Sequence, residues 1–223
     1  MAIIMHNLAQ VTKIYSNAKW FICLLACIFS FSTYANSNSI LILGDSLSAA
    51  YQIPEEQGWV ALLAAELKTT HPDWQVLNHS ISGETTAGGR QRLPQLLATH
   101  QPKIVVIELG GNDGLRGLPI FTILKNLESM IEMCKKAGSQ ILLIGMKLPP
   151  NYSEKYTQRF EDMYSRLSKK FEIPLLPFLL ENVALNNALM QADRIHPTAD
   201  AQPILLNSVK PMLLPLLSVA PAQ

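Results

Sequence analysis

The residues of this chain that could do chemistry lie at the ends of short apolar runs. Residues 40–43 are Ile-Leu-Ile-Leu, and the run stops at Gly44, Asp45 and Ser46. Four aliphatic residues in a row predict a short strand buried on both faces, as in the middle of a parallel sheet. Ligands bind in the crevice beyond the carboxyl ends of such strands, so Ser46 is placed to act as a nucleophile. The alternative is that Ser46 or Ser48 caps a following helix.

Two further strand ends carry residues that could stabilise a negative oxygen. An expected strand at 74–78 leads to a turn that contains Gly83, and another at 104–109 leads to Asn112. The carboxyl ends of parallel strands meet at one edge of a sheet, so these residues should lie near Ser46. Acyl transfer needs donors for the oxygen that becomes negative in the tetrahedral intermediate. The backbone N–H groups of Ser46 and Gly83 and the amide of Asn112 could supply three, although Gly83 and Asn112 are also ordinary turn residues.

A base for this serine is found near the other end of the chain, in Asp193-Arg194-Ile195-His196-Pro197. An acid three residues before a histidine can hydrogen-bond one ring nitrogen and leave the other to take a proton from serine. Asp193, His196 and Ser46 are therefore the candidate catalytic residues. The sequence has no paired cysteines in its mature part and no His-x-x-x-His spacing, so we expect neither a metal site nor a cofactor. Three other histidines adjoin a proline, a turn and a helix end, and we expect them to be structural: His71, His79 and His100.

The elements that must position these residues alternate between strand and helix. This alternation predicts one α/β domain with a parallel sheet and helices on both faces. The prolines 211, 215 and 221 predict that the last helix kinks or ends before a loose tail. The expected strands are residues 40–43, 74–78, 104–109, 140–146 and 173–176, and the expected helices include residues 59–67, 93–97, 120–134 and 153–171.

The first 35 residues are typical of a secretory signal peptide. They contain Lys13 and Lys19 but no acid, then a short apolar segment from 20 to 31, then small residues up to Ala35. We expect residues 1–35 to be removed, with translation starting at Met1 or Met5, and residues 36–223 to form the mature domain in the periplasm. An uncleaved membrane anchor is the alternative.

Composition excludes some classes of partner for the mature chain. Without Lys13 and Lys19 it keeps 16 of the 18 basic residues against 17 acids, which offers no basic patch for nucleic acid. Cys134 is the only cysteine after residue 35, so no intramolecular disulfide can form. It falls on the apolar stripe of the helix at 120–134, where we expect a core residue. We expect a monomer.

The four sequence stretches that carry these candidate residues together resemble those of the SGNH (GDSL) hydrolases, a family named for a Ser, a Gly, an Asn and a His. These correspond here to Ser46, Gly83, Asn112 and His196. The resemblance runs from about residue 40 to residue 217. This sequence departs from the family pattern at Arg194, where small residues are usual, and in Ala87-Gly88-Gly89. Both departures concern the opening of the substrate-binding site. The matching stretches are residues 42–49, 80–84, 108–117, 148–152 and 195–203.

The resemblance implies a three-layer, flavodoxin-like fold with a five-stranded parallel sheet, and a serine esterase that forms an acyl-serine intermediate. Ser46 would attack the carbonyl, His196 would act as base and then as acid, and Asp193 would orient the imidazolium. The implied substrates are small acyl esters and thioesters, including lysophospholipids, acyl-CoA, aryl esters and simple fatty esters, with transient contact with membrane lipid. The acyl chain is expected along four apolar residues that could equally serve packing: Leu115, Leu118, Leu148 and Pro149.

Two other functions remain open at this point. One is a carbohydrate O-acyl esterase of the same superfamily, which would remove small acyl groups from sugars. The other is a non-catalytic domain in which the turn from Gly44 to Ser48 binds an anion at a helix N-terminus.

Overall fold

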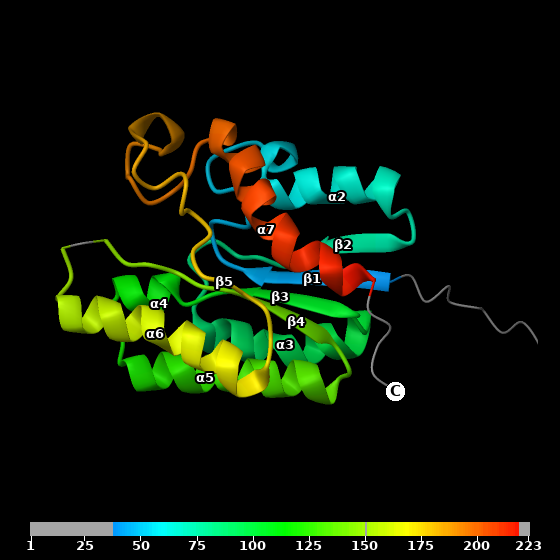
Figure 1. Cartoon of the computed structure of the whole chain (residues 1–223), viewed down its shortest axis with the longest axis horizontal. Helices are drawn as coiled ribbons and strands as arrows, with labels where there is room; N and C mark the ends of the chain where they lie inside the picture. Colours follow the sequence, from blue (N-terminus) through cyan, green and yellow to red (C-terminus); the bar gives the residue numbers. More distant parts are fainter. Residues whose placement is uncertain (1–37, 150, 219–223) are drawn as a thin grey trace, which may run out of the picture. The chain divides into compact units, whose positions relative to one another are not determined.

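The computed structural model describes residues 38–149 and 151–218. The expected signal peptide and its cleavage point at Ala35 lie outside this part of the chain. Five parallel strands form one sheet in the order β2-β1-β3-β4-β5 (Figure 1), which confirms the α/β fold and the five-stranded sheet expected from the sequence. The strands are β1 (Asn38–Gly44), β2 (Trp74–Asn78), β3 (Ile104–Glu108), β4 (Gln140–Ile144) and β5 (Leu175–Leu176).

Helices cover both faces of the sheet, so the described part has three layers (Figure 1). On one face lie α2 (Trp59–Thr70) and α7 (Gln202–Leu217), and on the other lie α3 (Thr86–His100), α5 (Ile120–Lys136) and α6 (Glu154–Phe171). A strand covered on both faces has no polar side, which is why β3 and the middle of β1 are apolar runs. The short elements are η1 (Glu55–Gln57), α4 (Gly111–Leu115), η2 (Asn187–Leu189) and η3 (Ala199–Ala201).

The apolar stripe of α5 packs into the core as its helical spacing predicts. Ile123, Leu127, Met130, Ile131 and Cys134 are all fully buried. Burial raises the pKa of the Cys134 thiol to about 12, so it stays protonated and inert at neutral pH. The expectation that Cys134 is a core residue is confirmed.

The structure adds detail at three points that the sequence left open. First, the last helix does not end at Pro211 or Pro215, because α7 continues to Leu217. A proline inside a helix costs a hydrogen bond, but both rings are exposed, and the opposite side of α7 buries apolar side chains at Leu205, Val209 and Leu213. Pro221 lies outside the described residues.

Second, the glycine-rich segment after β3 is not only a turn, because Gly111–Leu115 forms the short helix α4. Gly110 precedes it with φ 118°, a conformation that favours glycine. Third, neither Ser46 nor Ser48 caps a helix. Turns follow β1, and the first helical segment after them is η1.

Candidate active site

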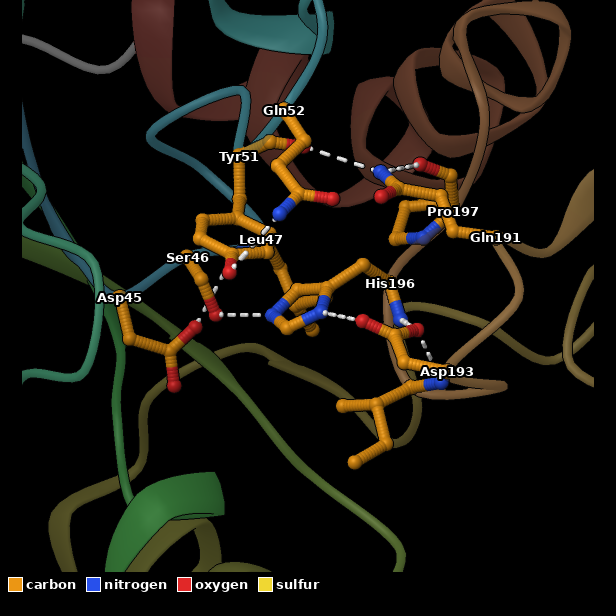
Figure 2. Close-up of polar contacts among 10 residues, drawn as sticks. Asp45, Ser46, Leu47, Tyr51, Gln52, Gln191, Asp193, His196 and Pro197 are labelled. Carbon is orange, nitrogen blue, oxygen red and sulfur yellow. Dashed lines mark hydrogen bonds and ion pairs between the residues drawn. The ribbon is translucent and has the colours of Figure 1, made fainter.

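Ser46, His196 and Asp193 form a chain of hydrogen bonds beyond the carboxyl end of β1 (Figure 2). Asp193 Oδ2 lies 2.6 Å from His196 Nδ1, and His196 Nε2 lies 2.8 Å from Ser46 Oγ. An ionised carboxylate can only accept, so Nδ1 carries a proton and Nε2 accepts the hydroxyl hydrogen of Ser46. The structure thus brings together residues up to 150 positions apart in the sequence, in the arrangement that activates a serine.

The Asp193 carboxylate is held in its ionised form by local donors. Besides the imidazole, the backbone N–H groups of Ile195 and His196 donate to Oδ1 over 2.9 and 3.0 Å. Burial alone would raise the pKa of Asp193, but these hydrogen bonds outweigh it and lower the pKa to about 2. The tight turn that allows them places Arg194 at φ 57°, in the left-handed region that glycine adopts most easily.

Tyr51 and Gln191 support His196, and neither was among the residues expected at the site. The Tyr51 ring lies against the imidazole with centroids 4.3 Å apart. Gln191 donates through Nε2 to the carbonyl oxygens of Tyr51 and Pro197, over 2.9 and 3.0 Å (Figure 2). These contacts join the loop after β1 to the loop that carries His196. No motif marks such residues, because their role depends on two segments about 140 residues apart.

The three candidate oxyanion donors come from the segments after β1, β2 and β3. The Ile81 N–H donates to the Gly44 carbonyl over 3.1 Å, which brings the turn with Gly83 to the end of β1. Gly83 has φ 80° and is exposed. Within residues 38–149 and 151–218 the N–H groups of Ser46 and Gly83 have no hydrogen-bond partner. Asn112, in α4, donates from Nδ2 to Asp45 Oδ2 over 3.1 Å, which leaves its amide a second N–H.

A buried polar cluster ties two of these segments together. Asp113 follows Asn112 and accepts from the Thr86 N–H over 2.9 Å and from the Thr86 hydroxyl over 2.6 Å. Asn126 of α5 donates to the same hydroxyl over 3.1 Å. All three side chains are buried, so the start of α3, α4 and α5 are fixed against one another.

The four residues expected along the acyl chain lie in the segments that follow β3 and β4, and each is half-buried. Tyr152 and Tyr156 donate to the carbonyls of Leu115 and Leu118 over 2.6 and 2.7 Å, which ties the two segments together. Leu118 and Leu148 also pack against the core, so packing explains part of their presence. A cavity of about 870 Å³ lies instead between α5 and α6, lined by none of these four residues.

The described residues include no group of three or more His, Cys, Asp or Glu side chains that could hold a metal ion. Among the same residues, no helix combines the length and the apolar character needed to cross a membrane.

The sequence model of the GDSL-like lipase/acylhydrolase family matches residues 42–202, a span that includes Ser46, Gly83, Asn112, Asp193 and His196. The chain belongs to this family. It is therefore a hydrolase, and as a GDSL enzyme it is a serine esterase.

Several named proteins are similar to this GDSL hydrolase in sequence or in fold. The chain is 48% identical over 183 residues to "Esterase TesA" of Pseudomonas aeruginosa, covering 82% of this chain and 91% of that protein. It is 40% identical over 204 residues to "Thioesterase 1/protease 1/lysophospholipase L1" of Escherichia coli, covering 90% and 95%. The crystal structure of the psychrotrophic esterase EstA from Pseudoalteromonas sp., inhibited by monoethylphosphonate, matches with a TM-score of 0.78 at 37% identity, covering 82% of this chain and all of that one.

Proposed function

We propose that this esterase hydrolyses acyl esters and thioesters with Ser46 as nucleophile, His196 as base and acid, and Asp193 as the residue that orients the imidazole. The observation that carries the proposal is the continuous hydrogen-bond chain from Ser46 Oγ through both nitrogens of His196 to Asp193 Oδ2. A serine hydroxyl is a weak nucleophile until a neighbouring base takes its proton, and this geometry supplies that base.

The reaction proceeds in two halves. Ser46 Oγ bonds to the carbonyl carbon while its proton moves to His196 Nε2, and the ionised Asp193 stabilises the imidazolium. The N–H groups of Ser46 and Gly83 and the amide of Asn112 stabilise the oxygen that becomes negative. The Nε2 proton then passes to the departing alcohol or thiol. Water, deprotonated by the same nitrogen, releases the acid and restores Ser46.

The substrate class we propose rests on the names of the relatives and on the half-buried apolar residues after β3 and β4. Leu115, Leu118, Leu148 and Pro149 would accommodate a fatty acyl chain. Hydrolysis of p-nitrophenyl esters of graded chain length, an acyl-CoA, a lysophospholipid and an O-acetylated sugar would test this. We expect higher kcat/KM for medium or long chains than for acetyl esters. A preference for the acetylated sugar would instead support the carbohydrate esterase.

A fluorophosphonate probe separates an active esterase from a domain that merely binds an anion. The probe labels only an activated serine, so the wild-type protein should be labelled and Ser46→Ala should not. Ser165→Ala, which removes an exposed hydroxyl on α6, serves as the matched control and should label normally. An unlabelled wild-type protein would contradict the proposal.

We propose that the mature enzyme acts in the periplasm and makes transient contact with anionic membrane lipid. The support for lipid contact is the cavity between α5 and α6. Its lining carries five basic side chains against two acidic ones, Glu128 and Asp162, and Phe121, which also lines it, is 69% exposed. Cosedimentation with vesicles should show weak binding to anionic lipid that salt reverses and that Phe121→Asp reduces. Equal binding to zwitterionic vesicles would contradict the charge-based account. The basic residues are Lys125, Arg159, Arg166, Lys169 and Lys170.

A further inference from the structure

Two buried carboxyl groups lie next to each other beside the nucleophile. Glu108 ends β3 and is fully buried, and Asp45 directly precedes Ser46 and is 3% exposed. The backbone N–H of Asp45 donates to Glu108 Oε2, which holds the two carboxyl groups close enough to interact electrostatically. Among residues 38–149 and 151–218, no lysine or arginine forms an ion pair with either carboxyl. Two adjacent buried carboxylates without a cation cannot both stay ionised.

The surroundings of Glu108 indicate where the remaining proton lies. Oε2 accepts from the Asp45 N–H over 3.1 Å and from the Ser48 hydroxyl over 2.7 Å. Oε1 is buried without a partner in the described part of the chain. Burying a carboxylate oxygen without a hydrogen-bond donor destabilises the fold, whereas a protonated oxygen can itself donate a hydrogen bond. The neighbouring acceptor is the carboxylate of Asp45. Gly44 leaves the space this arrangement needs, because a Cβ there would lie 2.5 Å from Oε2.

We propose that Glu108 is a positioning residue that stays protonated and donates to Asp45, so that Asp45 stays ionised and fixes the orientation of the Asn112 amide. This proposal rests on the oxyanion role proposed for Asn112. An ionised Asp45 only accepts: Oδ1 accepts from the Leu47 N–H and Oδ2 from Asn112 Nδ2, each over 3.1 Å. It therefore holds the NH₂ end of the amide rather than its carbonyl end, and the second N–H of Asn112 remains for the substrate oxygen.

The electrostatics of the pair agree with this distribution of charge. Burial raises the pKa of Glu108 well above its ordinary value, and the negative charge of Asp45 raises it further. Burial also raises the pKa of Asp45, but only to about 6, because the Leu47 N–H, Glu108, His196 and Asn112 all favour its ionised form. Tyr164 of α6 also faces the pair, and burial keeps it neutral by raising its pKa. At neutral pH the single charge therefore belongs to Asp45.

Infrared difference spectroscopy of the free enzyme tests the proton itself. At neutral pH the wild-type spectrum should contain the C=O band of a protonated carboxylic acid, which Glu108→Gln should lack. Glu132→Gln, which changes an exposed residue of α5, should retain the band. A wild-type spectrum without this band would overturn the proposal. The measurement needs no substrate and no mutant activity, so its result does not depend on the role of Asn112.

Steady-state kinetics of Glu108 variants test how the proton on Glu108 affects catalysis. The amide of Glu108→Gln can still donate to Asp45 and accept from its N–H, so kcat should stay within about threefold of wild type. Glu108→Leu removes both interactions and should lower kcat by roughly tenfold to a hundredfold with little change in KM, less than removal of the donor itself. A Gln variant as impaired as the Leu variant would show that a charged Glu108 is needed, and an unimpaired Leu variant would show no positioning role. If Asn112→Ala is fully active, the oxyanion assignment fails while the infrared result stands.

Discussion

The hydroxyl of Ser46 is half-buried, and its hydrogen bond is to His196, so it contributes little to packing. Ser46→Ala should therefore fold normally and lose turnover by about 10⁴-fold to 10⁶-fold, because no other group can form the acyl intermediate. Steady-state kinetics and a melting curve check this, with Ser165→Ala as the control. Turnover near the wild-type value would exclude Ser46 as the nucleophile.

Asn112 can be separated from Ser46 by the size of its effect. If its amide stabilises the oxyanion, Asn112→Ala should lose roughly two to three powers of ten in kcat, with a smaller change in KM, because the interaction strengthens as charge develops. The N–H groups of Ser46 and Gly83 would still support activity above background. A normal kcat with a lowered melting temperature would mean that Asn112 only shapes α4.

Asp45 gives the protein a pH-dependent stability. Its pKa is 3.8 in the unfolded chain and about 6 in the folded one, so between these values the unfolded state releases a proton that the folded state keeps. The wild-type protein should therefore lose stability as pH rises from about 4 to about 6. Asp45→Asn removes this titration and the charge that raises the pKa of Glu108.

The free energy of unfolding of Asp45→Asn, relative to wild type, should thus improve by up to about 3 kcal/mol between pH 4 and pH 7. Urea denaturation at both pH values measures the difference. Asp200→Asn, an exposed control, should show no such change. A difference independent of pH would mean that Asp45 titrates normally.

Among the secondary-structure elements, α3 ends in a backbone conformation that is unfavourable for its last residue. Gln101 ends α3 in the left-handed conformation, with φ 44° and ψ 50°. Glycine adopts this conformation without a Cβ penalty, so Gln101→Gly should stabilise the protein by about 0.5 to 1 kcal/mol. Thermal melts should show a rise of about 1 to 4 °C.

The same helix supplies the control for this prediction. Gln95 is also exposed but lies inside α3, where glycine costs conformational entropy. Gln95→Gly should therefore destabilise the protein by about 0.5 to 1 kcal/mol. Two changes of the same sign would mean that the left-handed end of α3 is not strained.

For the molecule as a whole, the N-terminal sequence predicts the compartment in which the enzyme works. The charged leader, the short apolar segment and the small residues before Ala35 predict export and cleavage after Ala35. Mass spectrometry of the periplasmic fraction should find a chain that begins at Asn36, and Ala35→Arg should accumulate the precursor. A full-length protein in that fraction would favour the uncleaved anchor.

Local sequence patterns are enough to predict most of the strands and helices of this protein. Runs of aliphatic residues mark β1 and β3, and helical spacing marks α5, so their positions agree with the structure to within a few residues. The residues proposed for catalysis were found in the same way, since Ser46 and Asn112 follow apolar runs and Asp193 lies three residues before His196.

The surroundings of those residues depend on contacts between distant parts of the chain, which local patterns do not show. Glu108 looks like the polar end of a strand in sequence, and only the packing of β3 against Gly44 shows it buried beside Asp45. Tyr51 belongs to no recognisable sequence motif, and its role becomes visible only from the contact of its ring with His196. Pro211 interrupts a helical pattern, but burial of the opposite side of α7 outweighs the lost hydrogen bond. Burial and long-range contact set these outcomes, and both depend on residues far apart in the chain.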